Sequence, residues 1–481
     1  LYNSIAEIIM AYSDELIPNN IDLSSDKKLQ RALENWHPKF MDWWKEMGPV
    51  DPYQAKNVYL RTAVSVDSEG WAHYDYVKMP EYRWGIFLTP FDEQRTIHFG
   101  DRIGEKTWND IPGEHRNELR RLIVTQADTE PASVEQQRLL ANTAPSLYDM
   151  RNLFQVNVEE ARHLWAMVYL LMRFFGRDGR EESEDLLARR SGHKDTPRIL
   201  SAFNEPITDW LDFFCFTMFT DRDGKYQLGS LAESAFDPLA RSTRFMLTEE
   251  AHHLFVGEKG VGRVIDRAGE LSLKYPNDNA EKQGYISLEI IQKYINHWFS
   301  ASIELFGSED STNASNYFAS GLKGRFDESD RIKYPDSKAQ GTYKYELIDD
   351  NGKIIEQEIP MRRALNAVLK DSYATDCERA VRNWNKILEK QNHPFRITLP
   401  SIRFNRKVGV YAGYHFDPSG NRLNEQEWKN NKNNYLPSEK DRNFVRSLMA
   451  HVIEPGKFAN WISAPAKGIN GMPAEFEYVQ L

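Results

Sequence analysis

Two short segments of the sequence carry the same pattern of acidic and imidazole side chains. Residues 159–164 (EEARHL) and 249–254 (EEAHHL) agree at five of six positions. Each lies inside a long segment whose apolar periodicity predicts a helix. Within each segment a glutamate and a histidine are three residues apart, so they share one face of that helix. A carboxylate and an imidazole that converge in this way are suitable ligands for a metal ion.

The second segment contains two histidines, and comparison with the first segment selects one of them. Glu249 and His252 also have the i, i+3 spacing, but position 252 corresponds to Arg162 in the first segment. The histidines in register are His163 and His253. The four ligands that this register predicts are Glu160, His163, Glu250 and His253.

Helical bundles that hold two metal ions take a further carboxylate from each of two other helices. Glu130 lies 30 residues before Glu160, and Asp221 lies 29 residues before Glu250, so this nearly equal offset favours the pair. Asp221 is the weaker assignment, because Arg222-Asp-Gly224 directly after it predicts the end of the helix. The competing carboxylates are Asp128 and Glu135 on one side and Asp209, Asp212 and Asp223 on the other.

A single Glu-x-x-His pattern is usually a solvated or hydrogen-bonded pair. Two nearly identical copies within apolar helices are different, because burying so many ionisable groups costs several kcal/mol per charge unless a metal compensates. Ligands of this kind without thiolate favour iron or manganese, and zinc stays open.

The remaining sequence supplies long helices to hold these side chains. The predicted helical segments are Ser24–Gly48, Pro112–Gln126, Ser146–Phe175, Glu181–Arg190, Glu205–Asp221, Leu231–Gly257, Ile286–Phe306 and Met361–Leu388. Pro38 interrupts the first of them. Tyr59–Val66 and Tyr82–Pro90 mix β-branched and aromatic residues with glycine and proline, which predicts short strands and loops.

These elements predict a mainly α-helical protein with a ferritin-like four-helix bundle. We expect residues 1–111 to form a helix and a small β and loop layer, and 112–306 to form the bundle. We expect 307–481 to be a loop-rich extension with one helical passage, packed on the bundle.

Composition and charge exclude several classes of protein. The 481 residues are 41% hydrophobic and 27% charged, as in ordinary globular proteins, and no apolar run is long enough to span a membrane. A net charge of −10 makes nucleic acid an unlikely partner. Only Cys215 and Cys377 are present, which excludes a disulfide framework and a cysteine-bound iron–sulfur cluster. Without a secretion signal, a cytoplasmic location is expected.

Motifs for other cofactors are missing. Residues 257–262 (GEKGVG) are followed by Arg263 rather than Lys-Ser or Lys-Thr, so they form no phosphate-binding loop, and a helix terminus is the simpler interpretation. No GxGxxG motif opens a βαβ unit, so nicotinamide and flavin binding are not indicated. Any electrons would therefore come from another protein.

Three classes of protein use such a metal motif: oxygenases, ferritin-like iron stores and the radical subunits of ribonucleotide reductases. About 175 residues after the bundle argue against a minimal store. Radical subunits carry a tyrosine one helical turn after the first histidine, where this chain has Met167.

Several long segments resemble the oxygenase components of benzoyl-CoA 2,3-epoxidases, a family of di-iron ferritin-like proteins. The resemblance runs from about Asn19 to the C-terminus. It is carried by residues 19–36, 58–72, 124–138, 147–171, 219–242, 245–258 and the C-terminal KFANWISAPAKGINGMPAEFEYV.

The resemblance implies a specific activity and a specific set of ligands. The reaction would be O₂-dependent epoxidation of the benzoyl-CoA ring at carbons 2 and 3, with the second oxygen atom leaving as water. Electrons would come from NADPH through a separate flavin and iron–sulfur reductase, component A. The six iron ligands would be Glu130, Glu160, His163, Asp221, Glu250 and His253, as the spacing also indicates.

Two further residues are candidates for the same cavity. Thr217 lies one turn before Asp221 and would relay a proton, and Gln126 lies one turn before Glu130 and would contact substrate. The simpler alternatives are that Thr217 bonds its own helix and that Gln126 packs on a neighbour. Cations that would meet the phosphates of coenzyme A are Arg241, Arg244, Lys259, Arg362 and Arg363.

Overall fold

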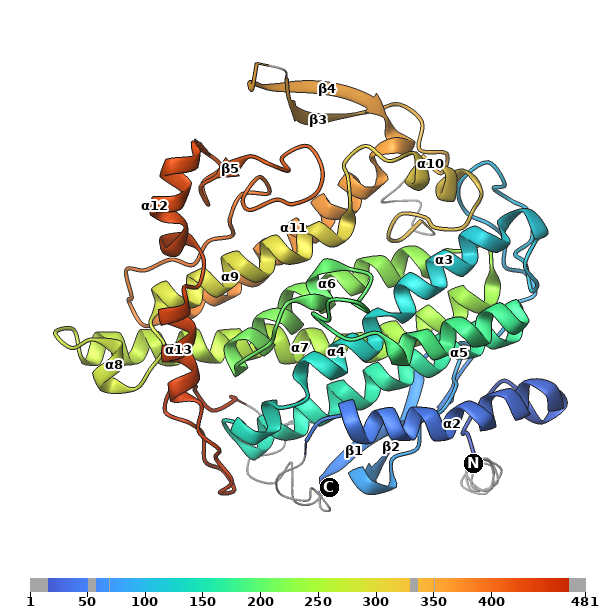
Figure 1. Cartoon of the computed structure of the whole chain (residues 1–481), viewed down its shortest axis with the longest axis horizontal. Coiled ribbons are helices and arrows are strands. Elements are labelled where there is room, and N and C mark those ends of the chain that lie inside the picture. The colour runs from blue at the N-terminus through green and yellow to red at the C-terminus, as the bar shows by residue number, and fades with distance from the viewer. Residues whose placement is uncertain (1–15, 51–57, 69, 329–335, 350, 467–481) are drawn as a thin grey trace.

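A computed structural model describes most of the chain (Figure 1). The described residues are 16–50, 58–68, 70–328, 336–349 and 351–466. The first 15 residues and the end of the C-terminal segment that carries the resemblance lie outside this part. The predicted mainly α-helical class is confirmed.

Long helices form the centre of the molecule. They are α3 (Arg116–Ala127), α4 (Thr129–Gln137), α5 (Leu147–Ala188), α6 (Trp210–Ala232) and α7 (Asp237–Lys274). α6 packs along α7, α3 and α4 pack along α5, and α5 contacts α7 (Figure 1). This arrangement is compatible with a ferritin-like bundle. No helix in the described part of the chain is long and apolar enough to cross a membrane.

α5 passes through the core of the molecule. It begins where the Ser146 side chain accepts a hydrogen bond from the Asp149 amide, which is a typical N-cap. Almost every residue from Tyr148 to Met172 is buried, as expected for a helix at the centre of a large core. Gly176 has φ 62° and ψ −122°, and this kink separates the two helices that the sequence predicted here.

α6 and α7 approach each other closely because α7 carries glycine at the contact. A Cβ built at Gly257 would lie 2.3 Å from the backbone nitrogen of Met218, and one at Gly260 would lie 2.1 Å from the Phe214 ring. The interpretation of residues 257–262 as a helix terminus is therefore wrong. These glycines lie inside α7 and allow the helix bearing one EExxH segment to pack tightly against α6.

The predicted end of α6 is also wrong. The helix starts at Trp210, later than predicted, and continues through Arg222-Asp-Gly224 as far as Ala232. Asp221 therefore projects from the middle of a regular helix. This turn-forming sequence stays helical because two of its own residues, Arg222 and Asp223, are buried and hydrogen-bonded.

An N-terminal layer covers α5. α2 (Lys27–Met47) remains one helix across Pro38 and buries Trp36, Phe40 and Trp43. β1 (Tyr59–Val66) and β2 (Ala72–Lys78) form an antiparallel hairpin, with a bulge between Ala63 and Ser65. Within the stretches predicted as short strands and loops, residues 82–90 form a mostly buried loop whose one bridge among the described residues joins Ile86 to Asn19.

The C-terminal part contains more regular structure than the single helical passage predicted. Its elements and those leading to it are α8 (Ala280–Gln283), α9 (Leu288–Ile303), α10 (Thr312–Ala319), β3 (Thr342–Ile348), β4 (Ile354–Pro360), α11 (Leu365–Lys390), β5 (His415–Phe416), β6 (Arg422–Leu423), α12 (Glu425–Tyr435) and α13 (Glu439–Leu448). α9 packs on α6, and α11 packs on α7 and α6. The short polar helices α12 and α13 were missed because they bury few apolar residues.

Candidate metal centre

The structure brings the six predicted side chains together in one buried cluster. They are Glu130 of α4, Glu160 and His163 of α5, Asp221 of α6, and Glu250 and His253 of α7. One donor atom each from Glu130, Glu160 and His163 lies within 4.8 Å of the others, and the same holds for Glu160, Asp221 and His253. The cluster therefore contains two overlapping groups of possible ligands.

Two glutamates face both histidines. The Glu160 carboxylate lies with one oxygen 3.7 Å from Nδ1 of His163 and the other 3.6 Å from Nδ1 of His253. The Glu250 carboxylate is placed in the same way, at 3.5 Å from His163 and 3.4 Å from His253. Both carboxylates thus have one oxygen on each side, as bridging ligands between two metal positions require.

The other two carboxylates each belong to one side of the cluster. An oxygen of Glu130 lies 3.3 Å from Nδ1 of His163, on the first side. Asp221 groups with His253 on the second side. Each of the two possible metal positions therefore faces one imidazole, one carboxylate of its own and two carboxylates shared with the other position.

Several donor atoms in the cluster have no hydrogen-bond partner in the described part of the chain. They include Nδ1 of both His163 and His253, Oδ2 of Asp221 and Oε2 of Glu250. Buried polar atoms without partners are costly, and native proteins rarely contain several together. All of them are oxygen or imidazole nitrogen atoms, so the donor set fits metal ions such as iron or manganese.

The cluster strongly perturbs its own carboxyl groups. Burial, together with the neighbouring carboxylates Glu130 and Glu250, raises the pKa of Glu160 well above its usual value. Burial and Glu250 also raise the pKa of Asp221. Burial alone would raise the pKa of Glu130, but its interaction with the neighbouring His163 holds it below the ordinary value. Four carboxylates this close need compensating positive charge.

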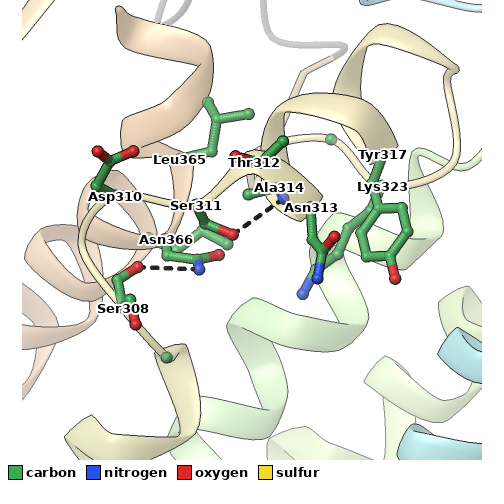
Figure 2. Close-up of a pocket in the computed structure, with 13 residues that line it drawn as sticks. Ser308, Asp310, Ser311, Thr312, Asn313, Ala314, Tyr317, Lys323, Leu365 and Asn366 are labelled. Atoms are coloured by element: carbon green, nitrogen blue, oxygen red, sulfur yellow. Dashed lines mark hydrogen bonds between the residues drawn. The ribbon is translucent and has the colours of Figure 1, made fainter. Parts of the chain in front are cut away.

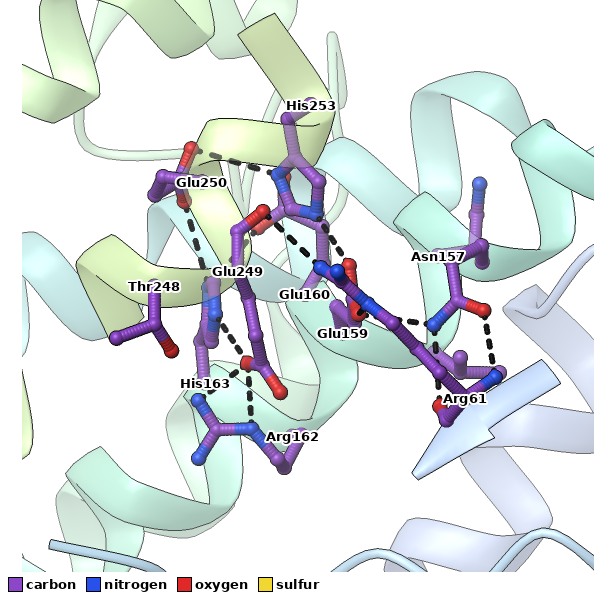
Figure 3. Close-up of polar contacts among 12 residues, drawn as sticks. Arg61, Asn157, Glu159, Glu160, Arg162, His163, Thr248, Glu249, Glu250 and His253 are labelled. Atoms are coloured by element: carbon purple, nitrogen blue, oxygen red, sulfur yellow. Dashed lines mark hydrogen bonds and ion pairs between the residues drawn. The ribbon is translucent and has the colours of Figure 1, made fainter. Parts of the chain in front are cut away.

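The first glutamate of each segment supports the opposite histidine, which the sequence analysis did not predict. Nε2 of His163 donates to Glu249 at 2.9 Å, and Nε2 of His253 donates to Glu159 at 3.2 Å (Figure 3). Each imidazole thus keeps Nδ1 directed at the cluster, a common arrangement for metal-binding histidines. The signal for these roles was present in the doubled glutamate of both segments.

An arginine holds each supporting glutamate. Arg162 Nε donates to Glu249 Oε2 at 2.6 Å, from within the first segment itself. Arg61 Nε of strand β1 donates to Glu159 Oε1 at 2.5 Å (Figure 3). Burial opposes ionisation of Glu159, but Arg61 lowers the pKa of this carboxyl below its usual value. Glu159 is therefore kept as an anion that accepts from the His253 imidazole.

Thr217 and Gln126, the two further candidates for the cavity, differ in their contacts. The Gln126 amide donates to Glu130 Oε1 at 3.0 Å, so it orients a candidate ligand. Thr217 is fully buried, and its hydroxyl has no hydrogen-bond partner in the described residues. The simpler alternative for Thr217, a bond to its own helix, is therefore not found.

The competing carboxylates have other partners. Arg198 forms ion pairs with Asp128 at 3.2 Å and Glu135 at 2.8 Å. Asp209 accepts from Tyr294, Asp212 pairs with Arg442, and Asp223 accepts from Gln227. Among the cations proposed to bind coenzyme A, Arg241, Arg362 and Arg363 form ion pairs with Asp237, Asp101 and Asp310.

The fold and the donor set together define a mainly α-helical protein with a buried carboxylate and histidine cluster, compatible with the ferritin-like class. No protein-family model matches the chain. The chain is 56% identical over 470 residues to benzoyl-CoA oxygenase component B of Aromatoleum evansii, which covers 97% of this chain and 98% of that protein. The chain therefore belongs to the family of benzoyl-CoA oxygenase component B proteins, as the resemblance predicted.

Proposed function

We propose that this protein is the oxygenase component of a system that epoxidises the aromatic ring of benzoyl-CoA. Benzoyl-CoA, O₂, two electrons and two protons give 2,3-epoxy-2,3-dihydrobenzoyl-CoA and water. Identity of 56% across nearly the whole chain to a benzoyl-CoA oxygenase component is the observation that carries this proposal. The alternatives are action on another aryl-CoA thioester and a non-catalytic iron-binding role.

The proposed cofactor is a pair of iron ions held by Glu130, Glu160, His163, Asp221, Glu250 and His253. When bound, this centre would supply the electrons and the Lewis acidity that reduce and cleave O₂. The protein contributes the positions of the ligands. Glu160 and Glu250 would help to hold both ions, because each has one oxygen facing each histidine.

The surrounding residues would keep the ligands in their reactive form. Glu249 and Glu159 accept the Nε2 protons of the two histidines and so leave Nδ1 free to bind metal. Gln126 holds Glu130 from its outer side. Thr217 has an unused hydroxyl one turn before Asp221, which suits transfer of a proton to a departing oxygen.

The substrate is proposed to approach the carboxylate side of the cluster. The four carboxylate residues retain 2 to 6% exposure, whereas both histidines are at 0%. What little exposure the cluster has therefore belongs to its carboxylate residues. Replacing Thr217 with Ala should lower the ratio of epoxide formed to electrons consumed, and an unchanged ratio would remove its proposed role.

The electrons are proposed to come from a separate component. A protein named component B has at least one partner component, and this chain lacks motifs for a nicotinamide, a flavin or an iron–sulfur cluster. A flavin and iron–sulfur reductase that oxidises NADPH, component A, would supply what is missing.

A single turnover under oxygen-18 gas tests this function. Iron-loaded, chemically reduced protein is mixed with benzoyl-CoA, and the thioester product is read by mass spectrometry. Incorporation of one labelled oxygen atom supports the proposal. Consumption of O₂ without labelled thioester would favour a different acyl thioester or an iron-oxidising role. Phenylacetyl-CoA serves as the matched control substrate.

A further inference from the structure

A basic groove lies between α2 and α5, on a protein whose net charge is −10. Its volume is about 590 Å³. The cationic side chains that line it are Lys27, Lys28, Arg31, Lys39 and Arg180. Glu184 is the single acidic residue in its lining, and it pairs with Lys39 at 2.6 Å.

Most of the positive charge in this groove is uncompensated. Lys28, Arg31 and Arg180 form no ion pair or hydrogen bond with other described residues, and all three are exposed. Exposed charges of one sign attract a partner of opposite charge and set the orientation in which it docks. An acidic protein surface is such a partner.

One member of a pair of contacting tryptophans lines the groove. Trp36 lines the groove, and its ring centroid lies 4.8 Å from that of Trp165 in an edge-to-face arrangement. Neither indole N–H has a hydrogen-bond partner in the described part of the chain, although both are buried. Hydrogen bonding therefore does not explain why both positions carry Trp rather than Phe.

Trp165 leads to the metal centre through a connected set of groups. It lies one helical turn after Arg162, which donates to Glu249 at 2.6 Å. Glu249 in turn accepts from Nε2 of His163 at 2.9 Å. From the groove, the path is thus the ring contact between Trp36 and Trp165, followed by the α5 backbone from Trp165 to His163.

We propose that this groove docks an acidic face of the electron-donating component, and that the packed rings of Trp36 and Trp165 lie on the path along which its electrons tunnel to the metal centre. The inference rests on the proposed function. Each transfer oxidises a reduced flavin or iron–sulfur group of the donor by one electron and reduces the metal centre by one. Two transfers supply the two electrons of the epoxidation, and the two protons come from solvent.

The phosphates of the substrate are the other anionic ligand to consider. Positions 163 and 165 are about 200° apart around α5, so Trp165 and the groove lie behind the helix, away from the cluster. A substrate seated there could not place its ring against the metals. A separate pocket, of about 450 Å³, includes Lys323 in its lining (Figure 2). Lys323 donates to Gln227 of α6, the helix of Asp221. An anionic ligand on that side would leave the groove free.

Docking is tested by equilibrium binding of component A to the full-length protein, with and without iron. The double variant K28Q/R31Q should bind component A about tenfold more weakly at low salt, and the difference should shrink at high salt. The control K432Q/K440Q changes the charge equally on α12 and α13, and its affinity should match the unaltered protein. Equal affinities for both variants would overturn the docking surface.

The same variants separate the two anionic ligands. K28Q/R31Q should bind benzoyl-CoA and 3′,5′-ADP with unaltered affinity. Weaker binding of either ligand, with unaltered binding of component A, would show that the groove serves the substrate and would overturn the proposal.

The electron route is tested with W36F and W165F, which keep an aromatic ring at each position. Binding of component A should be unaltered, while the rate at which component A reduces the iron centre should fall about tenfold or more. Unaltered reduction rates in both would overturn the route. Thermal unfolding identifies a variant that has lost its fold. In every variant, chemically reduced protein should still complete the oxygen-18 turnover. Failure of the unaltered protein in that turnover would count against the proposed function instead.

Discussion

The two halves of the metal centre are built from nearly the same hexapeptide but are supported differently. Around His163, the supporting Glu249 is held by Arg162, which comes from the bundle itself. Around His253, the supporting Glu159 is held by Arg61, which comes from strand β1 of the N-terminal hairpin. The second segment has histidine where the first has Arg162, so a residue from outside the bundle takes that place.

This difference shows that repetition of a motif does not imply repetition of its environment. The Arg162 side chain is 1% exposed, whereas that of Arg61 is 20% exposed. The first half is therefore complete within the helices, and the second half depends on a surface layer. The Arg61 guanidinium also lies 3.5 Å from the Glu249 carbonyl, so the hairpin contacts both helices.

The largest effects are expected from the ligands, where the two halves should behave alike. Replacing His163 or His253 with Ala should reduce bound iron to about one per chain or fewer and lower turnover at least about 100-fold. Metal analysis after reconstitution checks this. Retention of two irons in either variant would mean that the halves do not share one dimetal site.

Loss of a supporting glutamate should have the next largest effect. E249Q and E159Q keep the shape of the side chain but replace the acceptor for the imidazole N–H with a neutral amide. Each should weaken metal binding about 10- to 100-fold, as is typical for groups that orient metal ligands. Competition with a chelator measures the affinity. Equal affinities for both variants and the unaltered protein would remove the supporting role.

The arginines should separate the two halves most clearly. R162Q leaves Glu249 buried without its ion-pair partner and should lower the free energy of unfolding by about 3 kcal/mol. R61Q removes a partner that is partly solvated, so the expected loss in the free energy of unfolding is about 1 kcal/mol. This loss should be smaller at high salt. Chemical denaturation of both variants, at low and high salt, tests the order. A larger loss in R61Q would reverse the comparison.

The smallest effect is expected at His252, which comparison of the two segments excludes as a ligand. Burial, followed by the charge of Arg61, lowers the pKa of His252 well below its usual value, so it is neutral at physiological pH. H252A should leave metal content unchanged and alter the free energy of unfolding by less than about 1 kcal/mol. A loss of iron comparable to that of H253A would contradict the assignment.

Local sequence patterns predicted the helices and the cluster because both depend on short-range spacing. The i, i+3 pairs and the nearly equal offsets to Glu130 and Asp221 placed six side chains that the structure brings together. Helix ends were less predictable: Arg222-Asp-Gly224 has the composition of a turn, and only tertiary burial keeps it helical. Arg61 lies 98 residues from Glu159, and no spacing rule connects a strand to a helix over that distance.

Iron reconstitution followed by Mössbauer spectroscopy tests the central claim most directly, that the two segments build one dimetal centre. The account predicts two irons per chain, magnetically coupled through shared carboxylates. It also predicts two distinguishable sites, since Arg162 and Arg61 support them differently, and R61Q should perturb mainly the site of His253. One iron per chain, or two uncoupled irons, would contradict the account.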